Sequence, residues 1–210
     1  MNENKTPWRV LLVGGASGTG KSGLSYPLAR HFGVGVTELD DLYTAVKRMT
    51  TAEQQPALHY WDTHPEAMSW SAERILDLHR AVCRVLEPAV DAVLADHIEV
   101  AAPFILEGDY LLPEGAKNFV GRYPDKAVRA VFLLEDDEVQ LVRNFASREP
   151  DGGEQYGRAR VSRLFGEWLK GECDRLGLPA LLARPWDTLL RRTLRAVGAP
   201  DEVPNRPKVR

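Results

Sequence analysis

Eight residues near the amino terminus combine glycines with a lysine and a serine at a fixed spacing. They match the pattern G-x-x-x-x-G-K-[S/T] at every fixed position and run Gly15-Ala16-Ser17-Gly18-Thr19-Gly20-Lys21-Ser22. The glycines let the backbone curl, so that successive N–H groups point at an anion. Lys21 is expected to reach the β- and γ-phosphates of a nucleotide, and Ser22 to bind Mg²⁺ through its hydroxyl. The pattern therefore predicts a site for nucleotide phosphates.

The segments on either side of this run have the character that such a site needs. Residues 8–13 (Trp-Arg-Val-Leu-Leu-Val) are a short, mostly apolar run, typical of a buried parallel strand. Leu24, Leu28 and Phe32 then recur at helical spacing, which predicts a helix from Ser22 to Phe32. Its amino terminus adds partial positive charge where the phosphates would lie. A glycine-rich turn with only a structural role would not need this context or the Lys-Ser ending.

Two adjacent carboxylates follow the second predicted strand, residues 34–39. In an open α/β sheet, ligands bind beyond the carboxyl ends of the strands, so Asp40 and Asp41 are expected to face the phosphates. One of them is a candidate base for an acceptor hydroxyl, and the other a candidate partner of Mg²⁺ through water. The alternative is an N-cap for the helix that begins near Leu42.

A third apolar run, residues 103–106, also ends in acidic residues. Glu107 is the first candidate for the carboxylate that orients Mg²⁺ or its water beside Ser22, and Asp109 is the second. An acidic turn with no metal is the alternative for this segment.

A fourth strand is predicted over residues 128–134, with an acidic helix start at 135–138. The stretch 143–163 then carries several arginines around Pro150-Asp151-Gly152-Gly153. We predict that it forms a lid that excludes water and neutralises charge on a transferred phosphoryl group. Arg143 and Arg148 are the first candidates, ahead of Arg158; a solvated helix–loop–helix is the alternative.

The remaining segments are predicted more briefly. Residues 44–65 suggest a loop or broken helix that contacts an acceptor, and residues 66–97 a helix in which Pro88 forces a kink or begins a second helix. A fifth strand is expected at 178–183, and Pro185 and Trp186 after it are expected beside the adenine. The tail from Ala199 is expected to be disordered.

Composition narrows the class of protein. The chain has 210 residues, enough for one domain with a full core, and a formal net charge of −3. This charge gives no basic footprint for nucleic acid. Cys83 and Cys173 lack metal-ligand spacing and are expected to be buried rather than paired. No run approaches the roughly 20 apolar residues of a membrane span, so we expect a cytoplasmic protein.

The order of these parts resembles the P-loop small-molecule kinases, over roughly residues 8–198. Asp40-Asp41-Leu42-Tyr43 is similar to a motif of uridine kinase-like enzymes, and Phe104-Ile105-Leu106-Glu107-Gly108 to the strand of adenylate kinases that ends in Asp-Gly. The stretch from Val85 to Pro113 is similar to 2-phosphoglycerate kinase-like proteins. The Asp-Asp pair departs from the nucleotide monophosphate kinases.

The resemblance implies a three-layer α/β fold with a five-stranded parallel sheet in the order 2-3-1-4-5. It implies one domain over residues 1–198, with a core at 8–43 and 101–198, a helical insert on the acceptor side at about 44–100 and a lid after strand 4. The activity implied is Mg²⁺-dependent transfer of phosphate from ATP to a hydroxyl of a sugar, phosphorylated acid, nucleoside or antibiotic. The absence of a guanine-reading N-K-x-D motif favours ATP over GTP. The second hypothesis is an ATP-binding regulatory module that phosphorylates no metabolite.

Overall fold

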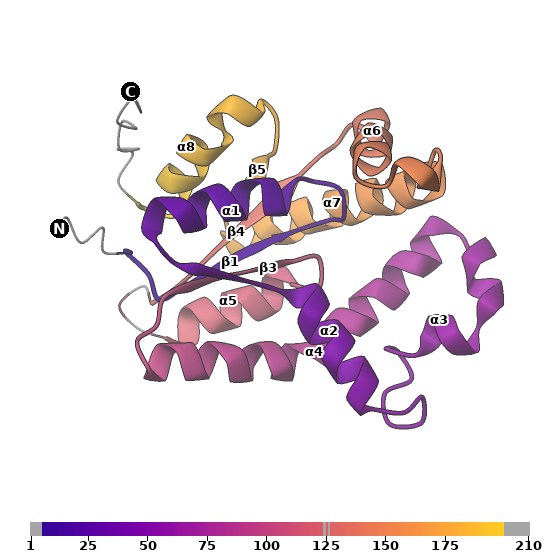
Figure 1. Cartoon of the computed structure of the whole chain (residues 1–210), viewed down its shortest axis with the longest axis horizontal. Helices are drawn as coiled ribbons and strands as arrows, with labels where there is room; N and C mark the ends of the chain where they lie inside the picture. Colours follow the sequence, from indigo (N-terminus) through magenta and orange to yellow (C-terminus); the bar gives the residue numbers. More distant parts are fainter. Residues whose placement is uncertain (1–5, 124, 126, 200–210) are drawn as a thin grey trace.

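Five parallel strands form one sheet in the order β2-β3-β1-β4-β5 (Figure 1). The computed structural model describes residues 6–123, 125 and 127–199. The strands are β1 Val10–Gly15, β2 Gly35–Glu38, β3 Phe104–Gly108, β4 Val128–Leu134 and β5 Ala180–Leu182. The predicted parallel α/β sheet and its strand order are therefore confirmed.

Helices cover both faces of this sheet. They are α1 Lys21–Phe32, α2 Leu39–Met49, α3 Tyr60–Thr63, α4 Ala72–Glu99, α5 Pro113–Arg122, α6 Glu138–Arg148, α7 Tyr156–Leu176 and α8 Trp186–Ala196. Two short 3₁₀ turns, η1 Pro65–Ser69 and η2 Pro150–Gly152, precede α4 and α7. Because α1 and α8 pack on one face and α4, α5 and α7 on the other, the molecule has three layers.

The side chains of β1 show why both faces are covered. Leu11 and Val13 join the cluster with α1 and α8, whereas Val10 and Leu12 join the cluster with α4, α5 and α7. Alternate residues of a strand point to opposite faces, and all four of these side chains are buried. A strand that is apolar at every position thus requires a helix layer on each side.

At Pro88 of the long helix α4, the structure excludes one of the two predicted outcomes, the start of a second helix. The helix begins at Ala72, after the N-cap Ser71, and runs to Glu99 without ending at the proline, so no second helix begins there. Proline removes one backbone hydrogen bond from a helix interior. Leu86 and Val90 on either side are buried, and this packing keeps the helix continuous.

The strand register brings acidic residues together at one edge of the sheet. Glu107 lies opposite Glu38 of β2 and Val13 of β1. The Gly15–Ser22 run, called the phosphate loop below, follows directly beyond β1. The carboxyl ends of the central strands therefore surround this loop.

The two cysteines, the helices and the carboxy-terminal segment bear on further expectations. Cys83 and Cys173 are buried and unpaired, as predicted. No helix within the described residues is long and apolar enough to cross a membrane. Ala199, where the disordered tail was expected to begin, is buried beside α8; the rest of that expectation, residues 200–210, lies outside the described residues.

Removal of a buried side chain of α7 should destabilise the whole domain. Leu169 is fully buried against the sheet, so Leu169→Ala should lower the free energy of unfolding by about 2–5 kcal/mol. Lys170→Ala is the matched control, because Lys170 is exposed and pairs only with Asp174 on the same helix; we expect it to cost about 0.5 kcal/mol or less. Urea unfolding measures both variants, and equal effects would contradict this packing.

Candidate functional site

The phosphate loop joins the end of β1 to the first turn of α1 in a backbone shape that requires glycine. Gly18 and Gly20 have φ angles of 79° and 86°, in the left-handed region that other residues rarely adopt. A Cβ on Gly20 would lie 2.5 Å from the ring of Trp186, and one on Gly18 would lie 2.9 Å from the ring of Phe145. The rings of Trp186 and Phe145 therefore pack against the loop at Gly20 and Gly18, where there is no side chain.

Lys21 is folded back over the loop that contains it. The residue is only 9% exposed, and its Nζ donates a hydrogen bond to the carbonyl oxygen of Ala16 at 3.0 Å. Thr19 Oγ1 donates to the same oxygen at 2.9 Å. This arrangement keeps the ammonium group at the loop, on a neutral carbonyl that a phosphate oxygen can replace as its partner.

Ser22 and Glu107 connect the phosphate loop to β3. Ser22 Oγ donates a hydrogen bond of 2.7 Å to Glu107 Oε1. Glu107 is 3% exposed, and its Oε2 has no hydrogen-bond partner among the described residues. Burial raises the pKa of this carboxyl group, while the Ser22 hydroxyl and the Lys21 charge oppose the rise. A buried carboxylate oxygen without a partner is costly, so the site has an unmet need for a cation or a donor.

These groups fit a magnesium ion. Mg²⁺ takes oxygen ligands and usually binds through one or two protein groups together with water and substrate phosphates. Ser22 supplies a hydroxyl and Glu107 a carboxylate, at the end of the loop where phosphates would bind. No cluster of three His, Cys, Asp or Glu side chains is arranged to hold a metal in residues 6–123, 125 and 127–199.

The two aspartates that follow β2 both lie in the first turn of α2. Their electrostatic surroundings differ. Burial raises the pKa of Asp40, as do the charges of Asp109 and Glu38, whereas Lys21 and Arg148 lower it. Asp40 therefore belongs to the group of charges around the phosphate loop, although much of its surface is exposed.

Asp41 is exposed on the same turn, and it acts on a different neighbour. Its charge contributes to raising the pKa of Tyr26, behind the larger effects of Glu38, burial and Glu107. Tyr26 belongs to α1, and its hydroxyl donates to Glu38 at 2.6 Å. The charge of Asp41 thus acts on Tyr26, whereas the pKa of Asp40 is influenced by Lys21, the first residue of α1.

Two helices reach the loop from the other side. Asn144 of α6 donates from Nδ2 to the carbonyl oxygen of Gly18 at 2.8 Å. Arg158 of α7 donates from Nη2 to Ser17 Oγ at 3.3 Å, and its guanidinium lies over the ring of Phe145. Arg158 was predicted to rank below Arg143 and Arg148, and Asn144 was not predicted. Both contacts join residues more than 100 positions apart in the chain, and no local sequence pattern indicates such contacts.

A cavity of about 320 Å³ opens between α6, the start of α8 and the phosphate loop. The residues that line it include Gly20, Lys21 and Ser22 from the loop side, Arg148 from α6 and Trp186 from α8. Pro185 and Arg143 are not among its lining residues. The structure therefore brings three of the candidates to the phosphate loop: Trp186 from the segment after β5, and Arg148 and Arg158 from the predicted lid. Arg143 is exposed on α6.

An ion pair positions the segment that carries Trp186. Arg184 Nε and Nη2 each donate to a different oxygen of Glu135, both at 2.7 Å, and Glu135 is buried at the end of β4. Within the acidic cluster 135–138, Glu135 makes the shorter contacts with Arg184, and Asp137 accepts a longer bond of 3.5 Å from the same side chain. Asp137 also caps α6 through the amides of Val139 and Gln140.

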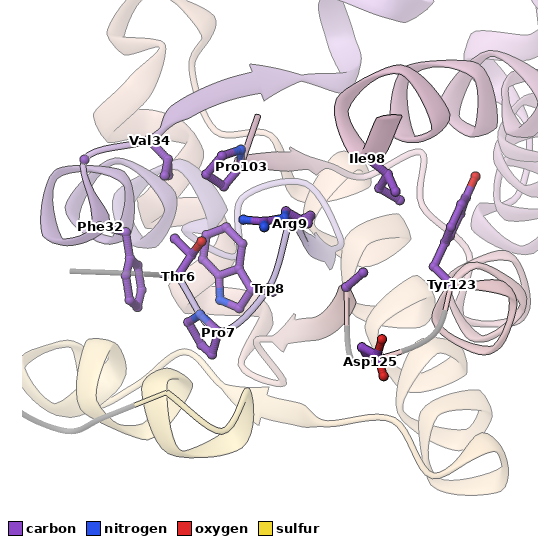
Figure 2. A pocket seen from close by; sticks show the side chains of 12 residues that line it. Thr6, Pro7, Trp8, Arg9, Phe32, Val34, Ile98, Pro103, Tyr123 and Asp125 are labelled. Carbon is purple, nitrogen blue, oxygen red and sulfur yellow. The ribbon is translucent and has the colours of Figure 1, made fainter. Parts of the chain in front are cut away.

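A separate cavity of about 710 Å³ lies at the other end of the strands. Figure 2 shows that Trp8, Arg9 and Pro103, which come just before β1 and β3, line it together with Tyr123. Since the phosphate loop follows the carboxyl end of β1, this cavity is remote from the charges described above.

Gly108 controls how closely α2 approaches the site. A Cβ at this position would lie 2.6 Å from Cβ of Leu39, the residue before Asp40. Gly108→Ala should therefore push α2 away and lower the free energy of unfolding by about 1–3 kcal/mol. Gly35→Ala on β2 is the control, because a Cβ there meets no atom within 4 Å. Chemical denaturation of both variants tests this; a harmless Gly108→Ala would refute the close packing.

The buried Glu107 carboxylate should make stability depend on pH. Its pKa is raised in the folded protein, so the folded state binds the proton more tightly than the unfolded state does. Stability should then fall as the pH rises from the ordinary glutamate value through the raised pKa. Glu107→Gln removes this loss, and its melting temperature should exceed that of the wild type by a few degrees at about pH 8 in metal-free buffer.

Added Mg²⁺ serves as the control for this pH effect. The ion should raise the melting temperature of the wild type more than that of Glu107→Gln. Thermal melts from about pH 4 to pH 8 provide the measurement, and parallel curves for the two proteins would count against the assignment.

Comparisons with known proteins place the fold. No protein-family profile matches the sequence, and no curated protein matches it. A gluconokinase from Sinorhizobium meliloti 1021 superposes with a TM-score of 0.52 at 17% identity, covering 91% of this chain and 92% of that one. The protein TT1252 from Thermus thermophilus superposes with a TM-score of 0.54 at 20% identity, covering 92% and 97%. At these identities the likeness is one of architecture: the chain has a three-layer α/β fold that it shares with a small-molecule kinase.

Proposed function

We propose that the protein is an ATP-dependent phosphotransferase that moves the γ-phosphoryl group to a hydroxyl of a small molecule. The observation that carries the proposal is the convergence of Lys21, Ser22, Glu107 and Asp40 around one glycine-rich loop. A fold neighbour named a gluconokinase is consistent with this class of reaction. Such an enzyme would act in the cytoplasm, where ATP is available.

The roles follow from the contacts of each side chain. The loop amides and Lys21 would bind the β- and γ-phosphates. Ser22 and Glu107 would hold Mg²⁺, which supplies charge neutralisation between these phosphates. Trp186, which lies against Gly20, would contact the nucleotide base, with Pro185 contributing only the backbone that leads into α8.

Asp40 is the proposed base for the acceptor. In the reaction, the acceptor oxygen forms a bond to the γ-phosphorus, and the bond from that phosphorus to the β–γ bridging oxygen breaks. ADP leaves with the electron pair, and the hydroxyl proton passes to the Asp40 carboxylate. The raised pKa of Asp40 makes it a better proton acceptor than an ordinary aspartate, and this favours it over Asp41.

The segment 143–163 would close over the transferred group. Arg148 lines the cavity at the loop, and Arg158 contacts Ser17, so these two arginines are best placed to balance developing charge. Arg143 would need a movement of α6 to take part. The insert at 44–100, which contains the end of α2 and all of α4, would then form the acceptor side. The core would be residues 8–43 and 101–198.

The decisive experiment is ADP release from Mg-ATP over a panel of hydroxyl acceptors. The panel includes sugars, nucleosides, aminocyclitol antibiotics and 2-phosphoglycerate, the last because of the resemblance of residues 85–113 to its kinases. With an active acceptor, Lys21→Ala and Asp40→Asn should each lower kcat/KM by about 10²- to 10⁴-fold. Asp41→Asn is the matched control and should stay within about twofold of the wild type.

The pH profile supplies a further check on Asp40. The acid limb of kcat/KM should lie above the range of an ordinary aspartate, because the base must be deprotonated and its pKa is raised. ATP binding without ADP release for any acceptor would instead favour a regulatory module. A fully active Asp40→Asn would exclude Asp40 as the base.

A further inference from the structure

A cavity of about 780 Å³ separates the insert from the lid. Its walls come from α3, from the first turns of α4 and from the first turns of α7. Figure 1 shows these segments facing one another at the end of the molecule away from the chain termini. Its volume lies within the range of small-molecule sites, which is about 300–1,000 Å³.

Most of the surface that lines this cavity is apolar. Trp61 and Trp70 contribute indole rings, and Ile75 and Val161 contribute aliphatic groups from opposite walls. Trp61 is 37% exposed, which is a large apolar surface to leave open to water. Trp70 is braced by the guanidinium of Arg74, which lies 3.1 Å from its ring centroid. The aromatic wall is thus held in place before any ligand binds.

The charged side chains of the cavity already have acidic or basic neighbours. Arg158 donates two hydrogen bonds to the Glu149 carboxylate, and Arg158, Gln155 and Arg148 lower the pKa of Glu149 to about 2. On the other wall, its own backbone amide and the Ser71 hydroxyl lower the pKa of Glu73, and Arg160 adds to the effect. An anionic ligand would therefore compete with the Glu149 carboxylate for Arg158.

The cavity leads to the phosphate loop. A smaller cavity of about 90 Å³ shares Arg158 and Val161 with it, and reaches Ser17 of the loop and Asp109 beyond β3. Asp109 is one of the charges that raise the pKa of Asp40. A ligand held between the tryptophans and α7 can thus direct one end toward Ser17 and the proposed base.

We propose that this cavity binds the acceptor, and that the acceptor is an uncharged alcohol bearing an aromatic or other apolar ring. The inference rests on the proposed phosphotransferase function and selects among its acceptors. A sugar carries hydroxyl groups around its ring, so it would cover less of the indole and aliphatic walls than an apolar ring does. A phosphorylated acid would have to compete with Glu149 for Arg158.

Two probes that share a glycerol skeleton test the proposal. 3-(1-Naphthyloxy)propane-1,2-diol carries an uncharged ring where glycerol 3-phosphate carries an anion. Isothermal titration of the full chain, without nucleotide, should give the naphthyl diol a Kd at least about tenfold lower, a difference of about 1.4 kcal/mol. Equal binding, or tighter binding of glycerol 3-phosphate, would overturn the proposal.

Variants identify the surface that binds the probe. Trp61→Ala should weaken binding of the naphthyl diol by about tenfold or more, because the half-open indole is the main apolar wall. Tyr156→Ala is the matched control: Tyr156 is 55% exposed at the start of α7 and is absent from the lining residues, so its loss should change the Kd less than about twofold. Tight binding that is insensitive to Trp61→Ala would overturn this location.

ADP release distinguishes failure of the proposed acceptor class from failure of the proposed phosphotransferase function. ADP release with the naphthyl diol, abolished by Lys21→Ala, supports both. Phosphorylation of glycerol 3-phosphate but not of the diol would overturn the acceptor class and leave the phosphotransferase function intact. No ADP release with any acceptor, while the diol still binds through Trp61, would overturn the acceptor role and the proposed function together.

Discussion

A hydrogen bond between Ser22 and Glu107 joins the two halves of the site, because one residue lies in the first turn of α1 and the other in β3. The bond forms at the carboxyl edge of the sheet, where Glu107 is enclosed by neighbouring strands and one of its oxygens lacks a partner. A buried carboxylate in this state is expensive for the folded protein. The fold tolerates it at a place where a bound cation would restore the balance.

Glycine is the second condition on which the site depends. At Gly18 and Gly20 the left-handed backbone and the nearby rings of Phe145 and Trp186 exclude any side chain. These rings come from α6 and α8, which follow β4 and β5. Loop shape and sheet order are thus linked: α6 and α8 can press on the loop only because β4 and β5 lie on the same side of β1.

The region that would choose an acceptor is built differently from the phosphate site. Around the loop, polar contacts with backbone carbonyls dominate, as in the bonds of Lys21 and Asn144. Between the insert and α7, indole and aliphatic groups form much of the walls, and Arg158 is paired with Glu149. Arg158 belongs to both regions, since it contacts Ser17 and also lines the apolar cavity. The Arg158 side chain therefore connects the two regions.

The sequence by itself determined the parallel sheet, the phosphate loop and the acidic ends of β2 and β3, because these depend on local signals: apolar runs, fixed glycine spacing and the residues directly after a strand. Ser22 and Glu107 could be paired in advance because parallel strands share one carboxyl edge. The continuity of α4 through Pro88, the separate surroundings of Asp40 and Asp41, and the contact of Asn144 with Gly18 depended on tertiary packing. So did the pairing of Arg184 with Glu135 and the cavity beside Trp61. Each of these joins residues far apart in the chain or distinguishes neighbours by what packs against them, and no local pattern encodes such contacts.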